Sequence, residues 1–516
     1  MIKIVLSERD FDYEIQALVN SFFPGQTSRV VLEDTKEADD PPQEWIGQIG
    51  VRMSRDTIRV WYDFSGHQEE KSCRVSGEQD FHKHEGKTAH PYRTEYKNQL
   101  KKLLFQLLQE METGILPEGV KLSVPVWGTM TGVRPAKIPM CQIMEGKSRE
   151  EIKQSLLQEY QCAEQKANLC IEVAQKEAGL LKKTDYQNGY SLYIGIPFCP
   201  TTCLYCSFPS YPLERFGALI PDYLEALKKE IAFCGRLCGD KKLSSIYMGG
   251  GTPTTLSAQQ LTELIQCVKE HFPVEEALEY TVEAGRPDSI TREKLQALRD
   301  AGVERISVNP QTMQDKTLQL IGRRHTVEQT KEVFWRAREM GFTNINMDLI
   351  IGLPGETAAD FQDTLCQLKE LNPDSLTIHS LVVKRASRLR EVMDACDDVL
   401  EAERAERMEQ MLALGEQFAS ENAYLPYYMY RQKNSAGYAG SSGQENIGYS
   451  RAGKECLYNI LIMEEKQTIL AVGAGASTKV YDARKNIVSR IENVKSVTDY
   501  IARIDEMLAR KERVLL

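Results

Sequence analysis

Residues 191–206 read SLYIGIPFCPTTCLYC and are the most informative stretch of the chain. The apolar run 192–196 is expected to be a strand, and Cys199, Cys203 and Cys206 follow it on a proline-rich loop. A zinc ribbon needs a second cysteine pair nearby, and none follows. Three cysteines on one short loop can instead bind three irons of a [4Fe–4S] cluster and leave the fourth iron open. A cysteine-rich packing loop is the alternative that spacing alone leaves open.

From Ser191 onward the sequence alternates between strand and helix patterns. Apolar runs predict strands at 192–196, 245–248, 278–283, 305–309, 344–350 and 375–379. Helical periodicity lies between them at 222–236, 258–271, 292–301, 327–340 and 359–371. Such βα units predict a parallel sheet, either a closed barrel or a partial one. In both cases functional side chains belong at the C-terminal ends of the strands.

Glycine or polar residues stand at those ends. Gly249-Gly250-Gly251-Thr252 ends the second strand and would let the backbone approach a ligand closely. Glu283 ends the third strand, where a carboxylate needs a cation or hydrogen-bond donors. Gln311 follows the fourth strand, Arg323 comes twelve residues later, and Asp348 lies in the fifth strand. Each has an ordinary alternative, such as a tight turn, a core salt bridge or a surface charge, but their shared position favours a ligand site.

Three motifs resemble those of a known family: residues 193–199 (YIGIPFC), 249–254 (GGGTPT) and 346–354 (NMDLIIGLP). Together with the cysteine spacing they resemble the radical S-adenosylmethionine (SAM) superfamily, and within it the oxygen-independent coproporphyrinogen III oxidases. The long N-terminal region and residues 430–434 and 473–479 resemble the HemZ-type branch. The resemblance runs from about residue 190 to 385 and continues more weakly to about 480.

The resemblance implies a partial (βα)6 barrel, a [4Fe–4S] cluster held by the three cysteines, and SAM bound to the open iron. Lys479 is a weaker candidate for a SAM contact. The implied SAM-binding residues are Tyr193, Tyr205, Gly250, Gly251, Thr252, Glu283, Gln311, Arg323 and Asp348.

The implied reaction is oxidative decarboxylation of coproporphyrinogen III to protoporphyrinogen IX through a 5′-deoxyadenosyl radical. Its partners would be the tetrapyrrole substrate and an electron donor such as flavodoxin or ferredoxin. Arg385 and Arg431 are candidates for holding the substrate propionates, because arginine pairs bidentately with carboxylates. A haem chaperone, or another tetrapyrrole-modifying radical SAM protein, is the alternative.

Composition limits the other function classes. The chain of 516 residues carries a formal charge of −10, which argues against a nucleic-acid-binding protein. No apolar run approaches the length of a membrane span, and the N-terminus lacks the shape of a signal peptide, so we expect a cytoplasmic protein. The 13 cysteines are scattered and odd in number, unlike a disulfide framework.

We expect an N-terminal α/β domain at 1–185, a radical SAM core at 186–385 and a small C-terminal domain at 386–516. In the first, strands are predicted at 2–6, 29–32 and 58–64, and helices at 96–111 and 151–181. In the last, helices are predicted at 388–420 and 497–510 and a strand at 468–472. The chain departs from the family where Phe208 replaces a further cysteine, and in its long N-terminal and short C-terminal parts.

Overall fold

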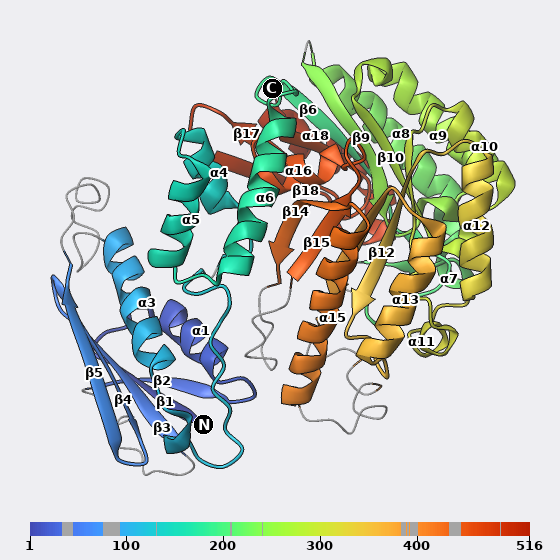
Figure 1. Ribbon diagram of the computed structural model, residues 1–516. Coiled ribbons are helices and arrows are strands. Elements are labelled where there is room, and N and C mark those ends of the chain that lie inside the picture. Colours follow the sequence, from blue (N-terminus) through green and yellow to red (C-terminus); the bar gives the residue numbers. More distant parts are fainter. Residues whose placement is uncertain are drawn as a thin grey trace. The chain divides into compact units, whose positions relative to one another are not determined.

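The computed structural model describes the chain except residues 34–44, 76–92, 131, 207–208, 240, 383–388, 390–391, 393–400, 433–444, 486 and 516 (Figure 1). The chain divides into two compact units. The first comprises Met1–Glu172, Val399–Glu406 and Arg431–Gln444, and the second comprises Val173–Asp398, Arg407–Tyr430 and Glu445–Leu516.

The first unit is built on a mixed sheet in which the described strands follow the order β2-β1-β3-β4-β5. These strands are β1 (Ile2–Leu6), β2 (Ser28–Leu32), β3 (Gly47–Met53), β4 (Thr57–Phe64) and β5 (His67–Arg74). Strand β1 pairs in parallel with β2 and β3, whereas β4 runs antiparallel to both of its neighbours. The strands predicted at 2–6, 29–32 and 58–64 are therefore present.

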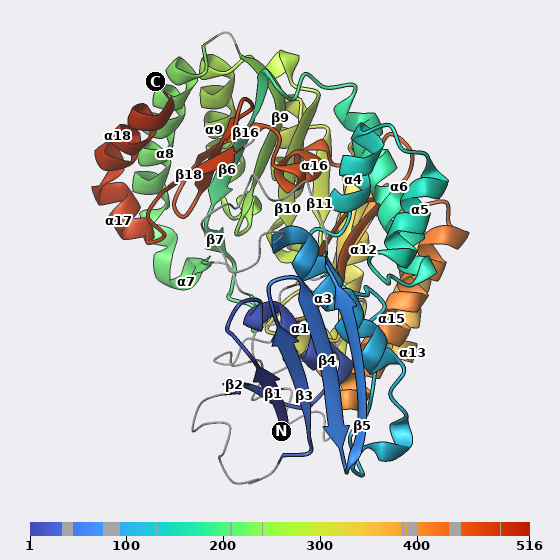
Figure 2. The same ribbon diagram turned by 90° about the vertical axis from the view of Figure 1, so that its left-hand side faces the viewer.

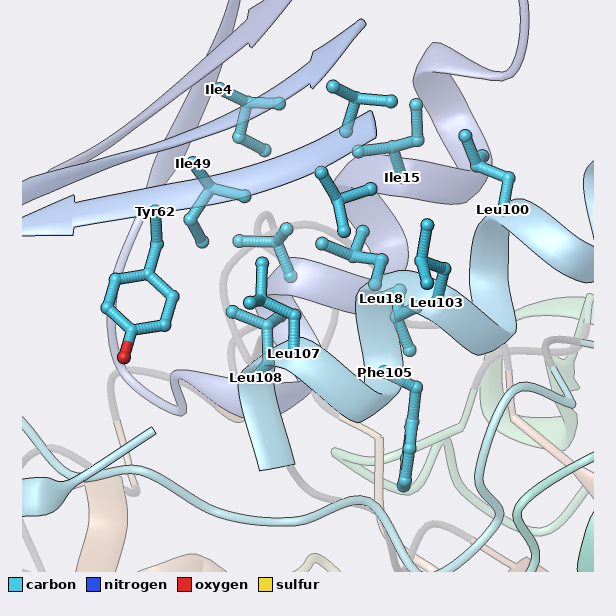
Figure 3. Packing of buried hydrophobic residues seen from close by; sticks show 14 of the residues in the cluster. Ile4, Ile15, Leu18, Ile49, Tyr62, Leu100, Leu103, Phe105, Leu107 and Leu108 are labelled. Atoms are coloured by element: carbon cyan, nitrogen blue, oxygen red, sulfur yellow. The ribbon is translucent and has the colours of Figure 1, made fainter. Parts of the chain in front are cut away.

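Helices α1 (Asp12–Phe22) and α3 (Arg93–Gln109) pack on this sheet through apolar side chains (Figure 3). Ile15 and Leu18 lie on one face of α1, and Leu100 and Leu107 lie on one face of α3, at the spacing of an amphipathic helix. Together with Ile49 of β3 they belong to one buried cluster. Burial of this cluster explains why α1 and α3 form where they do.

The helix predicted at 151–181 is two helices. Helix α5 (Arg149–Gln158) begins at a capping box between Ser148 and Glu151, and α6 (Glu164–Leu181) follows a short break. In that break Gln161 has a φ of 54°, and the carbonyl of Tyr160 accepts the amide of Thr129. A positive φ interrupts an α-helix, so the apolar periodicity continues while the helix does not. Helix α4 (Lys137–Met144) precedes the pair.

The second unit contains the predicted partial barrel. Six neighbouring parallel strands in chain order form its wall: β6 (Gly189–Ile196), β9 (Lys242–Gly250), β10 (Glu279–Gly285), β11 (Arg305–Val308), β12 (Asn344–Ile351) and β13 (Ser375–Ser380). The helices between them are α8 (Ile220–Leu237), α9 (Ala258–His271), α10 (Arg292–Asp300), α11 (Asp315–Leu320), α12 (Val327–Glu339) and α13 (Ala358–Leu371). The predicted βα alternation is confirmed, with element ends within a few residues.

The outer helices bury one apolar face each against the sheet. On α9, Leu261, Leu264, Ile265 and Val268 are all buried. Helices α8 and α9 pack side by side outside the sheet, and the last two helices, α17 (Val497–Ala502) and α18 (Ile504–Leu515), contact α8 (Figure 2). The single helix predicted at 497–510 is thus two.

The C-terminal strands extend the barrel sheet at both edges. Strand β16 (Thr468–Val472) runs parallel to β6, and β17 (Ser477–Asp482) and β18 (Ile487–Glu492) continue from it. At the other edge, β15 (Glu445–Ser450) runs antiparallel to β13, with β14 (Leu425–Arg431) beyond it. Backbone pairing therefore joins these C-terminal strands to the sheet of the barrel.

Two more helices complete the described C-terminal region: α15 (Glu401–Glu421), which overlaps the helix predicted at 388–420 and ends one residue beyond it, and α16 (Leu457–Glu464). Shorter elements are α7 (Leu213–Phe216), the two-residue strands β7 (Phe198–Cys199) and β8 (Tyr211–Pro212), and the 3₁₀ turns η2 (Thr113–Ile115), η3 (Gly217–Leu219), η4 (Pro253–Thr255), η5 (Val274–Glu276) and η6 (Pro287–Ser289). Among the residues the structure covers, no helix combines the length and apolar character needed to cross a membrane.

Candidate functional site

The cysteine loop leaves the C-terminal end of β6 and is fixed at both ends. The amide of Tyr211 donates to the carbonyl of Pro197 over 3.0 Å, which closes the loop at its base. Farther along, the amide of Leu204 donates to Ile321, and the hydroxyl of Thr201 donates to the carbonyl of Gly322 over 3.2 Å. The loop is therefore anchored to the segment after α11 as well as to its own strand.

The three cysteine side chains on this loop are each partly accessible. The hydroxyl of Thr252 donates to Sγ of Cys199 over 3.6 Å, and Nη1 of Arg286 donates to Sγ of Cys203 over 3.7 Å. Burial raises the pKa of the Cys199 thiol to about 11, so an iron bound there displaces a proton. Hydrogen-bond donors beside two of the sulfurs suit thiolate ligands.

The three loop cysteines are of the ligand type that binds an iron–sulfur cluster. The described part of the chain holds no group of three or more His, Cys, Asp or Glu side chains gathered closely enough to bind one metal ion. A cubane cluster needs a wider arrangement, because each thiolate binds a different iron. Cys199, Cys203 and Cys206 could hold such a cluster as three separate ligands.

The glycine segment after β9 lies directly beside the start of the cysteine loop. The amide of Gly251 donates to the carbonyl of Ile196, and that of Thr252 donates to Phe198, each over 2.7 Å. A Cβ atom at Gly251 would lie 2.5 Å from the carbonyl oxygen of Phe198, and Gly250 has a φ of 108°. The backbone can approach a neighbour this closely only because these positions lack side chains.

Glu283 sits at the end of β10, facing the glycine segment. Its carboxylate accepts hydrogen bonds from the Tyr247 hydroxyl and, over 3.3 Å, from the Gly250 amide. Burial raises the pKa of Glu283 to about 7, although the side chain keeps some access to solvent. The rings of Tyr193, Tyr247 and Tyr458 stack nearby, with 4.4 Å between the centroids of Tyr247 and Tyr458.

Gln311 and Asp348 meet at the next two strands. Gln311 has a φ of 72°, rare for a residue with a side chain, and its amide donates to the carbonyl of Asp348 over 3.0 Å. The amide of Ile350 in turn donates a hydrogen bond of 2.9 Å to the Gln311 carbonyl. The Asp348 carboxylate accepts from Nδ2 of Asn346 over 2.7 Å and lies 4.0 Å from Nε2 of His379. An uncommon backbone conformation held this firmly is typical of a binding site.

Arg323 is buried and reaches back to the cysteine loop. Its Nε and Nη2 atoms donate to the Tyr205 hydroxyl over 3.1 and 2.8 Å, and Nη1 donates to the Asn309 carbonyl over 2.6 Å. The neighbouring Arg324 is exposed. An isolated arginine is more often a surface charge, whereas Arg323 bridges the cysteine loop and the end of β11.

Three weaker candidates fall elsewhere. Lys479 on β17 pairs with Glu465 over 3.1 Å. The guanidinium of Arg431 stacks on Trp127, 5.3 Å from the ring centroid, and its amide donates to the carbonyl of Val133, within the first unit. Arg385 and Phe208 lie outside the described residues.

Sequence reasoning missed several residues that complete the site. Arg286 and Asp288 follow β10 in the segment GRPD (285–288), and Arg286 is only 3% exposed. Tyr247 lies within a predicted strand, where nothing in the sequence distinguishes it from a packing residue. Tyr458 comes from α16, which is far away in the sequence. The position of Arg286 three residues after Glu283 was the available signal, but one arginine beside a proline is not distinctive.

The assembled residues combine three soft thiolate ligands, a glycine segment for a zwitterion, a carboxylate facing that segment, and polar groups on the next two strands. All of them lie at the C-terminal ends of adjacent parallel strands, where such barrels bind ligands. This arrangement can hold a cluster and a small amphoteric cofactor next to each other.

Comparisons with known proteins show the superfamily to which the barrel sequence is similar. The family model of the radical SAM superfamily matches residues 193–368, a range that includes the three cysteines and Asp348. The chain is 38% identical over 423 residues to a Bacillus subtilis protein named oxygen-independent coproporphyrinogen-III oxidase-like protein HemZ, covering 81% of each chain.

Two further matches are more distant. The chain is 38% identical over 195 residues to the heme chaperone HemW of Bacillus subtilis, which covers 38% of this chain and about half (51%) of that relative. Among solved structures, coproporphyrinogen III oxidase HemN from Escherichia coli aligns with 24% identity and a TM-score of 0.49, over 64% of this chain and 73% of that one.

Proposed function

Because the chain belongs to the radical SAM superfamily, in the family of the HemZ-like oxygen-independent coproporphyrinogen-III oxidase-like protein, we propose that it decarboxylates coproporphyrinogen III oxidatively to protoporphyrinogen IX. The observation that carries the proposal is the set of site residues at the C-terminal ends of consecutive strands, in a chain that matches this relative along most of its length. The family implies a [4Fe–4S] cluster and SAM, and the residues described above fit both.

Cys199, Cys203 and Cys206 would hold the cluster and leave one iron open for SAM. When bound, these groups would supply an electron and a SAM-derived carbon radical, which is the chemistry needed to take a hydrogen atom from the β-carbon of a propionate; CO2 would then leave, one electron would pass to a separate one-electron acceptor, and a vinyl group would remain. The cofactors supply the radical reaction, so the protein contributes the orientation of the substrate and the exclusion of water.

In this proposal, different residues of the chain bind different parts of SAM. Gly250, Gly251 and Thr252 bring backbone close to the methionyl end of SAM, and Glu283 offers a carboxylate to its amine. Further around the barrel, Gln311, Arg323 and Asp348 would hold the nucleoside. Each already makes a backbone or side-chain hydrogen bond within the chain, which favours a preorganised site.

Aromatic rings lie next to the proposed SAM-binding residues. The rings of Tyr193, Tyr247 and Tyr458 stack on one another, and the Tyr247 hydroxyl donates to Glu283. Tyr205 lies on the cysteine loop and accepts hydrogen bonds from Arg323. In this proposal the cluster receives its electron from reduced flavodoxin or ferredoxin. The protein works in the cytoplasm.

A haem chaperone is the second candidate, because the chain is also 38% identical to HemW over 195 residues. The two functions differ in what happens to the tetrapyrrole. An oxidase converts coproporphyrinogen III in the presence of SAM and a reductant, whereas a chaperone binds haem and returns it unchanged.

The test is anaerobic product analysis of the reconstituted protein with coproporphyrinogen III, SAM and a chemical reductant, with haem titration in parallel. We expect protoporphyrinogen IX and its one-vinyl intermediate to appear, and Cys203→Ala to abolish both. Tight stoichiometric haem binding without any decarboxylation would instead establish the chaperone.

A further inference from the structure

Arg286 has a set of contacts that the proposed reaction does not use. It follows β10 directly, after Gly285, whose φ of 71° turns the chain toward the cysteine loop. Its guanidinium is almost fully buried, with 4% of the side chain exposed. A buried arginine must pair its charge and its donors with the groups around it.

One edge of this guanidinium is held by Asp288. Nε donates to Oδ1 over 3.0 Å and Nη2 donates to Oδ2 over 2.6 Å, which is the bidentate geometry that fixes an arginine most firmly. Asp288 is itself largely shielded, with 18% of its side chain exposed. The carboxylate thus fixes the direction in which the remaining nitrogen points.

That nitrogen, Nη1, points into the cysteine loop. It donates to the carbonyl and hydroxyl of Thr201, over 3.1 and 2.6 Å, and to Sγ of Cys203 over 3.7 Å. Cys203 therefore receives a hydrogen bond from a cationic donor that Asp288 holds in place. Hydrogen bonds and net charge at the sulfurs are among the factors that set the potential of an iron–sulfur cluster.

We propose that Arg286 is a positioning residue that orients Cys203 and raises the reduction potential of the cluster. Reduction adds negative charge to the cluster and its thiolates, so a buried cation beside one thiolate favours the reduced state. Asp288 lies on the opposite edge of the guanidinium, where it orients the cation and offsets part of its charge. This inference rests on the cluster assignment within the proposed function, and not on the identity of the substrate.

A role limited to anchoring the loop makes different predictions. In that case, replacing Arg286 would lower the amount of cluster bound while leaving the potential of the remaining cluster unchanged. Replacing Asp288 would act in the same direction as replacing Arg286. The electrostatic role requires the two replacements to move the potential in opposite directions.

The experiment is a redox titration of anaerobically reconstituted protein, followed by electron paramagnetic resonance and accompanied by iron analysis. We expect Arg286→Gln to shift the midpoint potential to a more negative value than in the unsubstituted protein. Arg286→Lys keeps the positive charge but loses the planar guanidinium that pairs bidentately with Asp288. Its midpoint potential should therefore lie between those of Arg286→Gln and the unsubstituted protein. Asp288→Asn should shift the potential to a more positive value, and Arg292→Gln, at the exposed start of α10, should change nothing.

The inference is overturned if Arg286→Gln and Asp288→Asn retain their cluster and keep the original potential, or if both shift it in the same direction. If Arg286→Gln fails to retain iron, Arg286→Lys and Asp288→Asn still decide the matter. The potential is measured without tetrapyrrole, so a protein that does not act on coproporphyrinogen III can still support or refute the role of Arg286.

Discussion

Arg323 and Tyr205 are joined by two hydrogen bonds to one hydroxyl oxygen, from Nε over 3.1 Å and from Nη2 over 2.8 Å. Tyr205 lies between the second and third cysteines, and Arg323 follows α11. The cysteine loop is therefore joined directly to a residue proposed to bind SAM. Disturbing either partner should affect both.

Replacing Arg323 should weaken SAM binding. A hydrogen bond to a charged group contributes about 1.5–3 kcal/mol, so Arg323→Ala should raise the dissociation constant for SAM roughly ten- to a hundredfold. Tyr205→Phe should weaken it less, because the guanidinium remains. Arg324→Ala is the matched control, since this exposed neighbour should leave binding unchanged. Equal effects of the two alanine variants would remove Arg323 from the site.

Only the three loop cysteines should be needed for the cluster. The reconstituted protein should bind about four irons, and Cys199→Ala, Cys203→Ala or Cys206→Ala should abolish the brown chromophore and SAM cleavage. Cys267→Ala, on helix α9, should keep both. A triple variant of the loop cysteines that still binds a full cluster would show that other ligands hold it.

Glu283 should make the stability of the metal-free protein depend on pH. Burial raises its pKa from 4.5 to about 7 in the folded chain, so below pH 4.5 both states are protonated and the shift has no effect. As the pH rises toward 7 the unfolded chain ionises first, and folding loses at most about 3 kcal/mol. Calorimetry should therefore show Glu283→Gln gaining stability relative to the unsubstituted chain between about pH 4.5 and 7. A constant difference across this range would contradict the assigned burial.

The glycine segment should tolerate no side chain where it meets the cysteine loop. In Gly251→Ala the new Cβ would lie 2.5 Å from the Phe198 oxygen and 2.8 Å from the Ile196 oxygen, so the backbone before Cys199 must move. We expect a loss of about 1–3 kcal/mol in stability and poor retention of iron. Gly179→Ala in α6 meets no atom within 4 Å and should be neutral or stabilising. Full iron content in Gly251→Ala would show that this contact is dispensable.

The sequence predicted the barrel well because each of its strands and helices is marked by local apolar periodicity. It missed β3 and β5 for physical reasons. Strand β5 is mostly exposed and carries no apolar alternation, and β3 contains Gly47 and Gly50, over which the rings of Phe64 and Trp61 lie. Neither strand therefore has the pattern of a half-buried sheet.

Pairing between strands that are far apart in the sequence could not be predicted from local sequence patterns. Strand β16 joins β6 in parallel, and buried Ser191 donates to Gln467, which is 276 residues away. The same limit applies to the site, where residues at strand ends could be grouped from the sequence. Tyr458 and Arg286 could not, because their roles depend on which distant groups the fold brings beside them.

The most direct test of the account uses coproporphyrinogen III deuterated at the β-carbons of its propionates. Anaerobic turnover with SAM and a reductant should give protoporphyrinogen IX together with 5′-deoxyadenosine one mass unit heavier, because the hydrogen leaves the substrate for the SAM-derived carbon. Unlabelled 5′-deoxyadenosine with the propionates intact would contradict the account, since SAM would then be cleaved without acting on this substrate.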